Sequence, residues 1–253
     1  MGERCVDFSK IPLSEDGFYA TNNQFQRTGP KGFIEVKVLE NEDLYVRVDF
    51  PGLPSQDLKL SLANERKLVQ FSGKGLSDFD DDKEDVREFY GETGLGCDCC
   101  KINDVTAKAE SGVIRMTITR VKVKERNTKC ILTLPPFIGK SGRHVEDNPF
   151  VVKGRKGTLV GEPTDEGGLN FAVDVPGVCA DDIEVIAQGN EVRFFADTKD
   201  DDEGVGVRSY EGTIICPNDA SSLADSVGWD VEFGVLKILI PPPTKKTTTT
   251  TTN

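Results

Sequence analysis

Residues 44–60 read LYVRVDFPGLPSQDLKL, and residues 169–185 read LNFAVDVPGVCADDIEV, so this chain of 253 residues carries one pattern twice. The two stretches align without a gap at a separation of 125 residues (169 − 44). A second anchor, Gly112-Val-Ile and Gly234-Val-Leu, recurs at a separation of 122 residues (234 − 112). An internal repeat of this size indicates two copies of one folding unit.

Both copies have the patterning of strands. Apolar residues alternate with charged or polar ones at Ile34, Val36 and Val38 and again from Ile114 to Ile118. This period of two is typical of strands that bury one face, and it excludes an amphipathic helix. Turn formers such as Pro51-Gly52 separate the alternating runs. The sequence therefore predicts an all-β fold, made of two tandem immunoglobulin-like antiparallel β-sandwiches.

The same repeat sets the predicted domain organisation. We expect two sandwich domains, joined by a linker and flanked by a short N-terminal arm and a disordered Thr-rich tail. The predicted segments are arm 1–30, first domain 31–124, linker 125–156, second domain 157–242 and tail 243–253.

Composition narrows the classes of function. Lys and Arg number 31 and Asp and Glu 43, a formal charge of −12, which would repel a nucleic-acid backbone. No apolar run reaches the length of a membrane-spanning helix. The seven cysteines are an odd number, and the N-terminal sequence lacks an apolar export region. We therefore expect reduced thiols and a cytoplasmic protein, with the nucleus as the alternative.

The motifs Asp49-Phe-Pro-Gly52 and Asp174-Val-Pro-Gly177, followed by the distant pairs Gly112-Val113 and Gly234-Val235, resemble the alpha-crystallin domain of small heat shock (HSP20) proteins. Two copies in one chain are similar to the divergent, tandem HSP20-like proteins of plants. The resemblance implies an alpha-crystallin-like sandwich for each copy, and a stress-related chaperone that binds other polypeptides.

In that family an apolar groove at a sheet edge captures extended segments, which is the principle of strand addition. Carried over by position, the resemblance assigns this groove to residues of both copies, although each of these side chains could instead belong to the sandwich core. The predicted groove residues are Leu68, Val69, Phe71, Val105, Ala107 and Ala109 in the first copy, and Val192, Phe194, Phe195, Val227, Trp229 and Val231 in the second.

The family also anchors a tail segment of alternating apolar residues in such a groove. Leu132-Thr-Leu134, before Pro135-Pro136, is the candidate anchor here, and an additional strand is the alternative. The final tail has no apolar anchor, which argues against the large assemblies of the family. The two sandwiches could instead pair with each other as an intramolecular pseudo-dimer.

Nothing in the sequence favours catalysis. The single histidine, His144, lies in the predicted linker, and neither a phosphate-binding loop nor a nucleophile elbow is present. Cys97, Cys99 and Cys100 form the densest thiol cluster, but zinc sites normally use two separated pairs. We therefore expect no enzyme, no metal and no cofactor.

Three functional hypotheses follow. The first is an ATP-independent holdase that binds unfolding clients and prevents their aggregation. The second is an HSP20-like adaptor or scaffold for one dedicated protein partner, without general chaperone activity. A third is a co-chaperone similar to the p23/CS domains, which share the sandwich fold.

Overall fold

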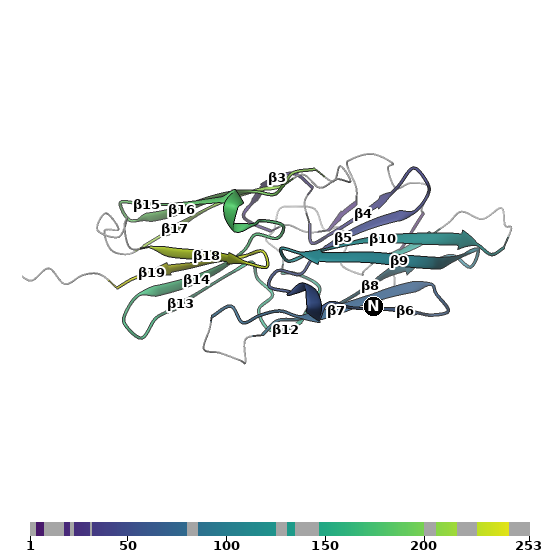
Figure 1. Cartoon of the computed structure of the whole chain (residues 1–253), viewed down its shortest axis with the longest axis horizontal. Coiled ribbons are helices and arrows are strands. Elements are labelled where there is room, and N and C mark those ends of the chain that lie inside the picture. The colour runs from purple at the N-terminus through teal and green to yellow at the C-terminus, as the bar shows by residue number, and fades with distance from the viewer. Residues whose placement is uncertain are drawn as a thin grey trace, which may run out of the picture.

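The computed structural model describes residues 4–7, 18–20, 23–30, 32–79, 86–124, 131–134, 147–199, 206–216 and 227–242. Across these ranges the chain forms strands and two short 3-10 turns, η2 (Ser55–Asp57) and η3 (Ala180–Asp182). The strands make four antiparallel sheets, which pair into two sandwiches that lie side by side along the long axis of the molecule (Figure 1). The prediction of an all-β fold with two tandem sandwiches is confirmed.

The first sandwich combines a sheet in the order β1-β11-β8-β7-β6, with β12 also on β8, and a sheet in the order β2-β4-β5-β10-β9. Its strands are β1 (Arg4–Asp7), β2 (Phe18–Ala20), β4 (Ile34–Val38), β5 (Leu44–Asp49), β6 (Lys59–Ala63), β7 (Leu68–Lys74), β8 (Glu88–Leu95), β9 (Cys100–Glu110), β10 (Val113–Lys122), β11 (Ile131–Leu134) and β12 (Val151–Lys153).

The second sandwich combines sheets in the orders β13-β14-β19-β18 and β15-β16-β17-β3. Its strands are β3 (Gln26–Thr28), β13 (Leu159–Pro163), β14 (Leu169–Asp174), β15 (Ile183–Gln188), β16 (Glu191–Asp197), β17 (Ser209–Ile215), β18 (Gly228–Glu232) and β19 (Val235–Ile240). The repeated motif thus supplies β5 in one sandwich and β14 in the other.

One prediction about the first sandwich is too simple. Strands β4 and β5 were expected to bury only their apolar face, but every residue of both strands is buried. Glu35 and Arg47 lie on the second face, where Arg47 Nε is 3.7 Å from Glu35 Oε2. Arg47 also donates to the carbonyl of Gly32 at 2.6 Å. The alternation thus identified the two strands. Their polar face is buried as well, because residues outside both strands, such as Gly32, contact it.

Two short strands are exchanged between the sandwiches. Strand β3 lies between β2 and β4 of the first sandwich in the sequence but pairs with β17 of the second, where Tyr210 lies opposite Gln26. Strand β12 precedes the second sandwich but pairs with β8 of the first, where Phe89 lies opposite Val151. Each unit therefore receives a strand from the segment that leads into the other unit.

A phenylalanine accompanies each exchanged strand into the neighbouring core. The ring of Phe25 meets Phe194 edge-on at 5.5 Å, inside the core of the second sandwich. The ring of Phe150 lies 5.8 Å from Phe71 and 6.0 Å from Phe50 in the core of the first. Neither core is complete without a side chain from beyond its own domain.

The predicted arm and linker are consequently more than connections. Strands β1 and β2 of segment 1–30 join the sheets of the first sandwich, whereas β3 joins the second. Strands β11 and β12 of segment 125–156 both pair with β8. Strand β11 was an alternative left open for Leu132–Leu134, whereas β1, β2, β3 and β12 were not predicted, because three or four residues are too few for a periodic pattern. His144 and the tail 243–253 lie outside the described residues.

Candidate protein-binding site

On one side, the first sandwich ends in two edge strands, β6 and β9. Among the described residues, neither β6 nor β9 pairs with a further strand on its outer side. Turn η2 leads directly into β6 and also contacts β9, so the two edges lie on one side of the sandwich. An open sheet edge presents backbone donors and acceptors that can pair with an added strand.

Apolar side chains line the inner face of both edges. On β6, Leu60 lies opposite the core residue Phe71, and Leu62 lies opposite Val69. On β9, Ala107 lies opposite the buried Met116. Cross-strand partners share a face, so these side chains point between the sheets. We call this set edge strip 1: Leu58, Leu60, Leu62, Val105, Ala107 and Ala109.

The second sandwich repeats the arrangement at β15 and β18. Val185 lies opposite the core residue Phe194 on β16, and Trp229 lies opposite the core residue Ile238 on β19. Turn η3 contacts β18 as η2 contacts β9. We call this set edge strip 2: Ile183, Val185, Ala187, Val227, Trp229 and Val231. Leu60, Leu62 and Trp229 stay 38%, 38% and 41% exposed, so both strips remain accessible.

Half of the predicted groove lies one strand too far inside. Strand β7 carries Leu68, Val69 and Phe71, and strand β16 carries Val192, Phe194 and Phe195, but both strands are paired on their two sides. Val69, Phe71, Val192 and Phe194 belong to the two cores. These four side chains are buried in the folded protein and follow the alternative for them, which was a place in the sandwich core.

The other half lies where an edge site requires it. Val105, Ala107 and Ala109 are on β9, and Val227, Trp229 and Val231 border or belong to β18. Their true neighbours, Leu58 to Leu62 and Ile183 to Ala187, were missed. The signal was present in the sequence, because apolar residues recur at every second position in DLKLSLA and in DIEVIA, four residues after each Pro-Gly motif.

The candidate anchor has a different position. The backbone of β11, which contains Leu132 and Leu134, pairs with β8 and on its other side with β1. Leu132 lies opposite Leu95 of β8, in the half of the sheet away from β6. In this structure the segment is an additional strand of its own sandwich, which was the alternative to docking.

The interface between the sandwiches repeats its contacts about a pseudo-twofold relation. Asn23 Nδ2 donates to the carbonyl of Asp174 at 2.7 Å, and Asn148 Nδ2 donates to the carbonyl of Asp49 at 2.9 Å. The amide of Gly52 donates to Phe233 at 2.8 Å, as that of Gly177 does to Ser111 at 2.8 Å. The repetition follows from the sequence repeat, since both members of each pair occupy equivalent positions.

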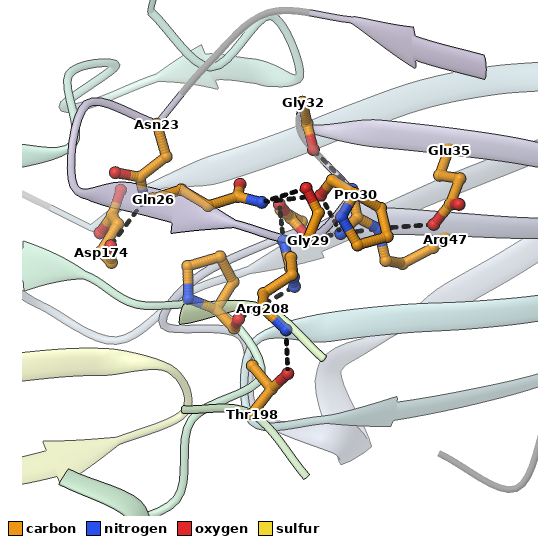
Figure 2. Close-up of polar contacts among 12 residues, drawn as sticks. Asn23, Gln26, Gly29, Pro30, Gly32, Glu35, Arg47, Asp174, Thr198 and Arg208 are labelled. Carbon is orange, nitrogen blue, oxygen red and sulfur yellow. Dashed lines mark hydrogen bonds and ion pairs between the residues drawn. The ribbon is translucent and has the colours of Figure 1, made fainter. Parts of the chain in front are cut away.

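Two buried ion pairs follow the same relation. Arg208 Nη1 lies 2.9 Å from Asp49 Oδ2, and Arg87 Nη1 lies 2.9 Å from Asp174 Oδ2. Figure 2 shows Arg208 among the contacts of segment 23–32, with its backbone amide bonded to Thr198 Oγ1. Burial lowers the pKa of the Arg208 guanidinium, but the charge of Asp49 outweighs this effect and raises the pKa. These charges are therefore stabilised by their partners across the interface.

Asp78 adds a further buried contact between two segments. Arg155 Nε, from the segment after β12, lies 2.7 Å from Asp78 Oδ2, and Arg87 Nη2 lies 3.5 Å from Asp78 Oδ1. Burial opposes ionisation of Asp78, but the hydrogen bond from Arg155 and the charges of both arginines lower its pKa below 3.8. Asp78 therefore remains ionised at neutral pH and holds the segment after β7 against the segment after β12.

The upstream part of the repeat was also missed. Residues 23–32 read NQFQRTGPKG and residues 148–157 read NPFVVKGRKG, which share Asn, Phe, Gly, Lys and Gly at the same 125-residue separation. Extending the alignment upstream would have indicated a structural role for Asn23, Phe25 and their counterparts. It would not have shown that each segment serves the opposite sandwich.

Two paired β-sandwiches with open apolar edges place the chain in the class of tandem β-sandwich proteins. Within the described ranges, no helix has the length and apolarity that crossing a membrane would require. The chain belongs to the family described as predicted plant small heat shock protein, whose model matches residues 5–243.

Similar proteins agree with this membership. The chain is 38% identical over 117 residues to the "Putative 57 kDa heat shock protein" of Arabidopsis thaliana, which covers 46% of this chain and 22% of that protein. It is 34% identical over 92 residues to the "23.6 kDa heat shock protein, mitochondrial" of Arabidopsis thaliana, covering 36% of this chain and 44% of the relative. The chain thus spans less than half the length of either relative.

A shorter relative is covered more completely. The chain is 26% identical over 132 residues to the "17.4 kDa class III heat shock protein" of Arabidopsis thaliana, covering 48% of this chain and 84% of the relative. Since half of this chain suffices to match most of that protein, the match agrees with the presence of two similar units in one chain.

Proposed function

We propose that this protein is an ATP-independent holdase, which binds exposed apolar segments of unfolding clients at edge strips 1 and 2. The observation that carries the proposal is the pair of open sheet edges in each sandwich, with accessible apolar side chains on their inner faces. An extended client segment would gain backbone hydrogen bonds from an edge strand and apolar contacts from the strip. Neither interaction requires nucleotide hydrolysis or covalent chemistry, so the function that we propose is not enzymatic.

The exchanged strands support one molecule as the working unit. Because β3 and β12 tie the sandwiches together within one chain, we propose that this intramolecular pair takes the place of a dimer of two chains. Each molecule then offers two binding strips. The cytoplasm is the proposed compartment, with the nucleus as the alternative, and the names of the relatives do not restrict it because they mention mitochondria and chloroplasts.

The test is suppression of heat-induced aggregation of a thermolabile client enzyme, followed by light scattering. We expect the full chain to suppress scattering at an equimolar ratio without ATP. A double variant, Leu60→Ser with Leu62→Ser, should lose most of the suppression of scattering that edge strip 1 provides. Trp229→Ser should lose most of the suppression that edge strip 2 provides. Both changes replace exposed side chains, so the fold should persist.

Ile215→Ser is the matched control, because Ile215 is a 70% exposed apolar residue on β17 outside both strips. Its suppression should equal that of the unchanged chain. No suppression by the unchanged chain would refute the holdase proposal, and equal losses in strip and control variants would refute the site.

The second candidate is a dedicated adaptor for one protein partner. The intramolecular pairing of the sandwiches favours it, because a closed pair does not require the large assemblies of general holdases. Size-exclusion chromatography with light scattering separates the two candidates. A large polydisperse assembly would support the holdase, whereas a monomer without suppression of aggregation would support the adaptor.

A further inference from the structure

Three thiols that the binding function does not use meet at one end of the first sandwich. Cys97 and Cys99 lie in the connection between β8 and β9, and Cys100 is the first residue of β9. The Sγ atoms of the three residues all lie within 4.8 Å of one another. Cys99 and Cys100 are buried, whereas Cys97 is partly exposed and leaves the cluster accessible. The second copy has only Cys216 in the corresponding region.

The sulfur spacing fits a tetrahedral metal ion. Two thiolates bound to zinc at about 2.3 Å lie about 3.8 Å apart at the tetrahedral angle. Cys99 Sγ and Cys100 Sγ are 3.8 Å apart. The distances from Cys97 Sγ to the other two Sγ atoms are at most 4.8 Å. Cys97 Sγ would therefore have to move by no more than about 1 Å to reach the same tetrahedral spacing. The spacing along the chain argued against a metal, but it did not show this convergence of sulfur atoms.

The backbone that carries the thiols is held from three sides. Lys67 Nζ donates to the carbonyl of Cys97 at 2.7 Å and also to that of Cys100. The amide of Val123 donates to the carbonyl of Cys99 at 2.8 Å. Lys124 Nζ lies 3.7 Å from Asp98 Oδ2 in the same connection. A connection fixed in this way positions its ligands before a metal arrives.

The local charge also suits a thiolate site. Arg120 Nη1 lies 3.4 Å from Cys100 Sγ, and a guanidinium at this distance favours a negatively charged sulfur. Three thiolates around a divalent cation carry a net charge of about −1. Lys67, Arg120 and Lys124 surround the connection with positive charge that offsets it.

The geometry points to a metal site at Cys97, Cys99 and Cys100 that binds zinc through three thiolates, with the fourth position of the tetrahedron open to water or another ligand. Soft thiolate ligands in tetrahedral geometry select zinc over hard cations such as Mg²⁺ and Ca²⁺. The connection between β8 and β9 links the two sheets of the first sandwich. Bound zinc would crosslink its three cysteines and so make this connection rigid. This inference goes beyond the proposed client binding and does not depend on it.

The test is titration of the reduced full-length chain with Co²⁺, followed by displacement with Zn²⁺. We expect one Co²⁺ per chain, sulfur-to-cobalt charge-transfer absorption and the intense visible bands of a tetrahedral site, all abolished by Zn²⁺. Cys97→Ser and Cys99→Ser should weaken binding by about 100-fold or more, because loss of a ligand exceeds the usual effect of losing an outer contact. Cys97 is partly exposed, so its variant should fold, as circular dichroism would verify.

Cys179→Ser is the control, since Cys179 lies between β14 and η3 on the second sandwich and is also partly exposed. It should bind Co²⁺ like the unchanged chain. Failure of the reduced, folded chain to take up Co²⁺ would overturn the inference. Equal uptake by folded Cys97→Ser, or uptake without charge-transfer absorption, would overturn it as well.

Discussion

At the scale of single residues, the interface between the sandwiches depends on positions where no side chain fits. Gly112 has a φ of +69°, and a Cβ there would lie 2.2 Å from the carbonyl oxygen of Phe233. Gly234 has a φ of +71°, and a Cβ there would lie 2.3 Å from the carbonyl oxygen of Ser111. Because the obstacle is backbone of the opposite sandwich, neither side can yield without separating the two units.

We therefore predict that Gly112→Ala destabilises the protein by more than backbone strain alone. A left-handed conformation costs an alanine about 1–2 kcal/mol, and the contact with Phe233 adds to this cost. Gly189→Ala is the control, since Gly189 has a φ of +62° with no atom within 4 Å of the added Cβ. Urea unfolding measures both. Equal losses of unfolding free energy would show that the clash has no effect.

A second residue-scale prediction concerns pH. The pKa of Asp78 is lowered in the folded state from its ordinary value of 3.8, so the ionised form stabilises the fold. For a lowered pKa, this stabilisation is fully present above the unfolded value and is lost as the pH falls below about 4, through the folded value. Asp78→Asn should lower the urea midpoint at pH 7 and weaken its dependence on pH below about 4. An unchanged acid dependence would contradict the assignment.

At the scale of elements, an asparagine secures each exchanged strand. Asn23 Oδ1 accepts from the amide of Phe25 at 2.9 Å, and Asn148 Oδ1 accepts from that of Phe150 at 3.0 Å. The same side chains donate to the carbonyls of Asp174 and Asp49, the last residues of β14 and β5 respectively. Each asparagine thus fixes the entry of an exchanged strand and bonds it to the sandwich that the strand joins.

We predict that Asn148→Ala destabilises the protein by about 1–3 kcal/mol, because it leaves buried backbone groups without hydrogen bonds. Asn23→Ala should have a similar effect through the other strand. Asn41→Ala is the control, since Asn41 bonds only to Asp43 on the exposed turn between β4 and β5. Thermal unfolding followed by circular dichroism is the measurement. If Asn41→Ala lowered the stability as much as Asn148→Ala, the proposed role of the asparagine hydrogen bonds would be contradicted.

The strands themselves were largely predictable, whereas their partners were not. Alternating residues identified β4, β5 and β10, and the repeat located β14 and β19. The predicted groove residues on β7 and β16 lie one strand inside the open edges, because alternation shows which face is buried but not which strand ends the sheet. Edge position depends on the pairing of distant segments, and no local pattern records it.

At the scale of the whole molecule, the exchanged strands make the two sandwiches mutually dependent. Each sandwich lacks a strand and a core phenylalanine if the chain is divided between them. A cleavage site placed among residues 136–146 would leave β3 on the first fragment and β12 on the second. Both exchanged strands would then connect separate polypeptides.

We predict that the two fragments remain together after cleavage. Size-exclusion chromatography under native conditions should show one species with the mass of the intact chain, 27.7 kDa. In a denaturant the fragments should separate, which serves as the control for complete cleavage. Two separate, folded halves under native conditions would show that the exchange does not hold the sandwiches together.

The sequence by itself determined that this protein has two copies of one β-sandwich. The reason is that the alternation of apolar residues and the positions of glycines are local features, and both copies contain them. Only the tertiary structure decided which segment completes which sandwich, where the edges stay open, and that three cysteine sulfurs converge. Residues such as Phe25 and Phe150 fit either core by their chemistry. Their assignment depends on the path of the whole chain, because the free energy of burial depends on the site that is filled and not on the sequence position of the residue that fills it.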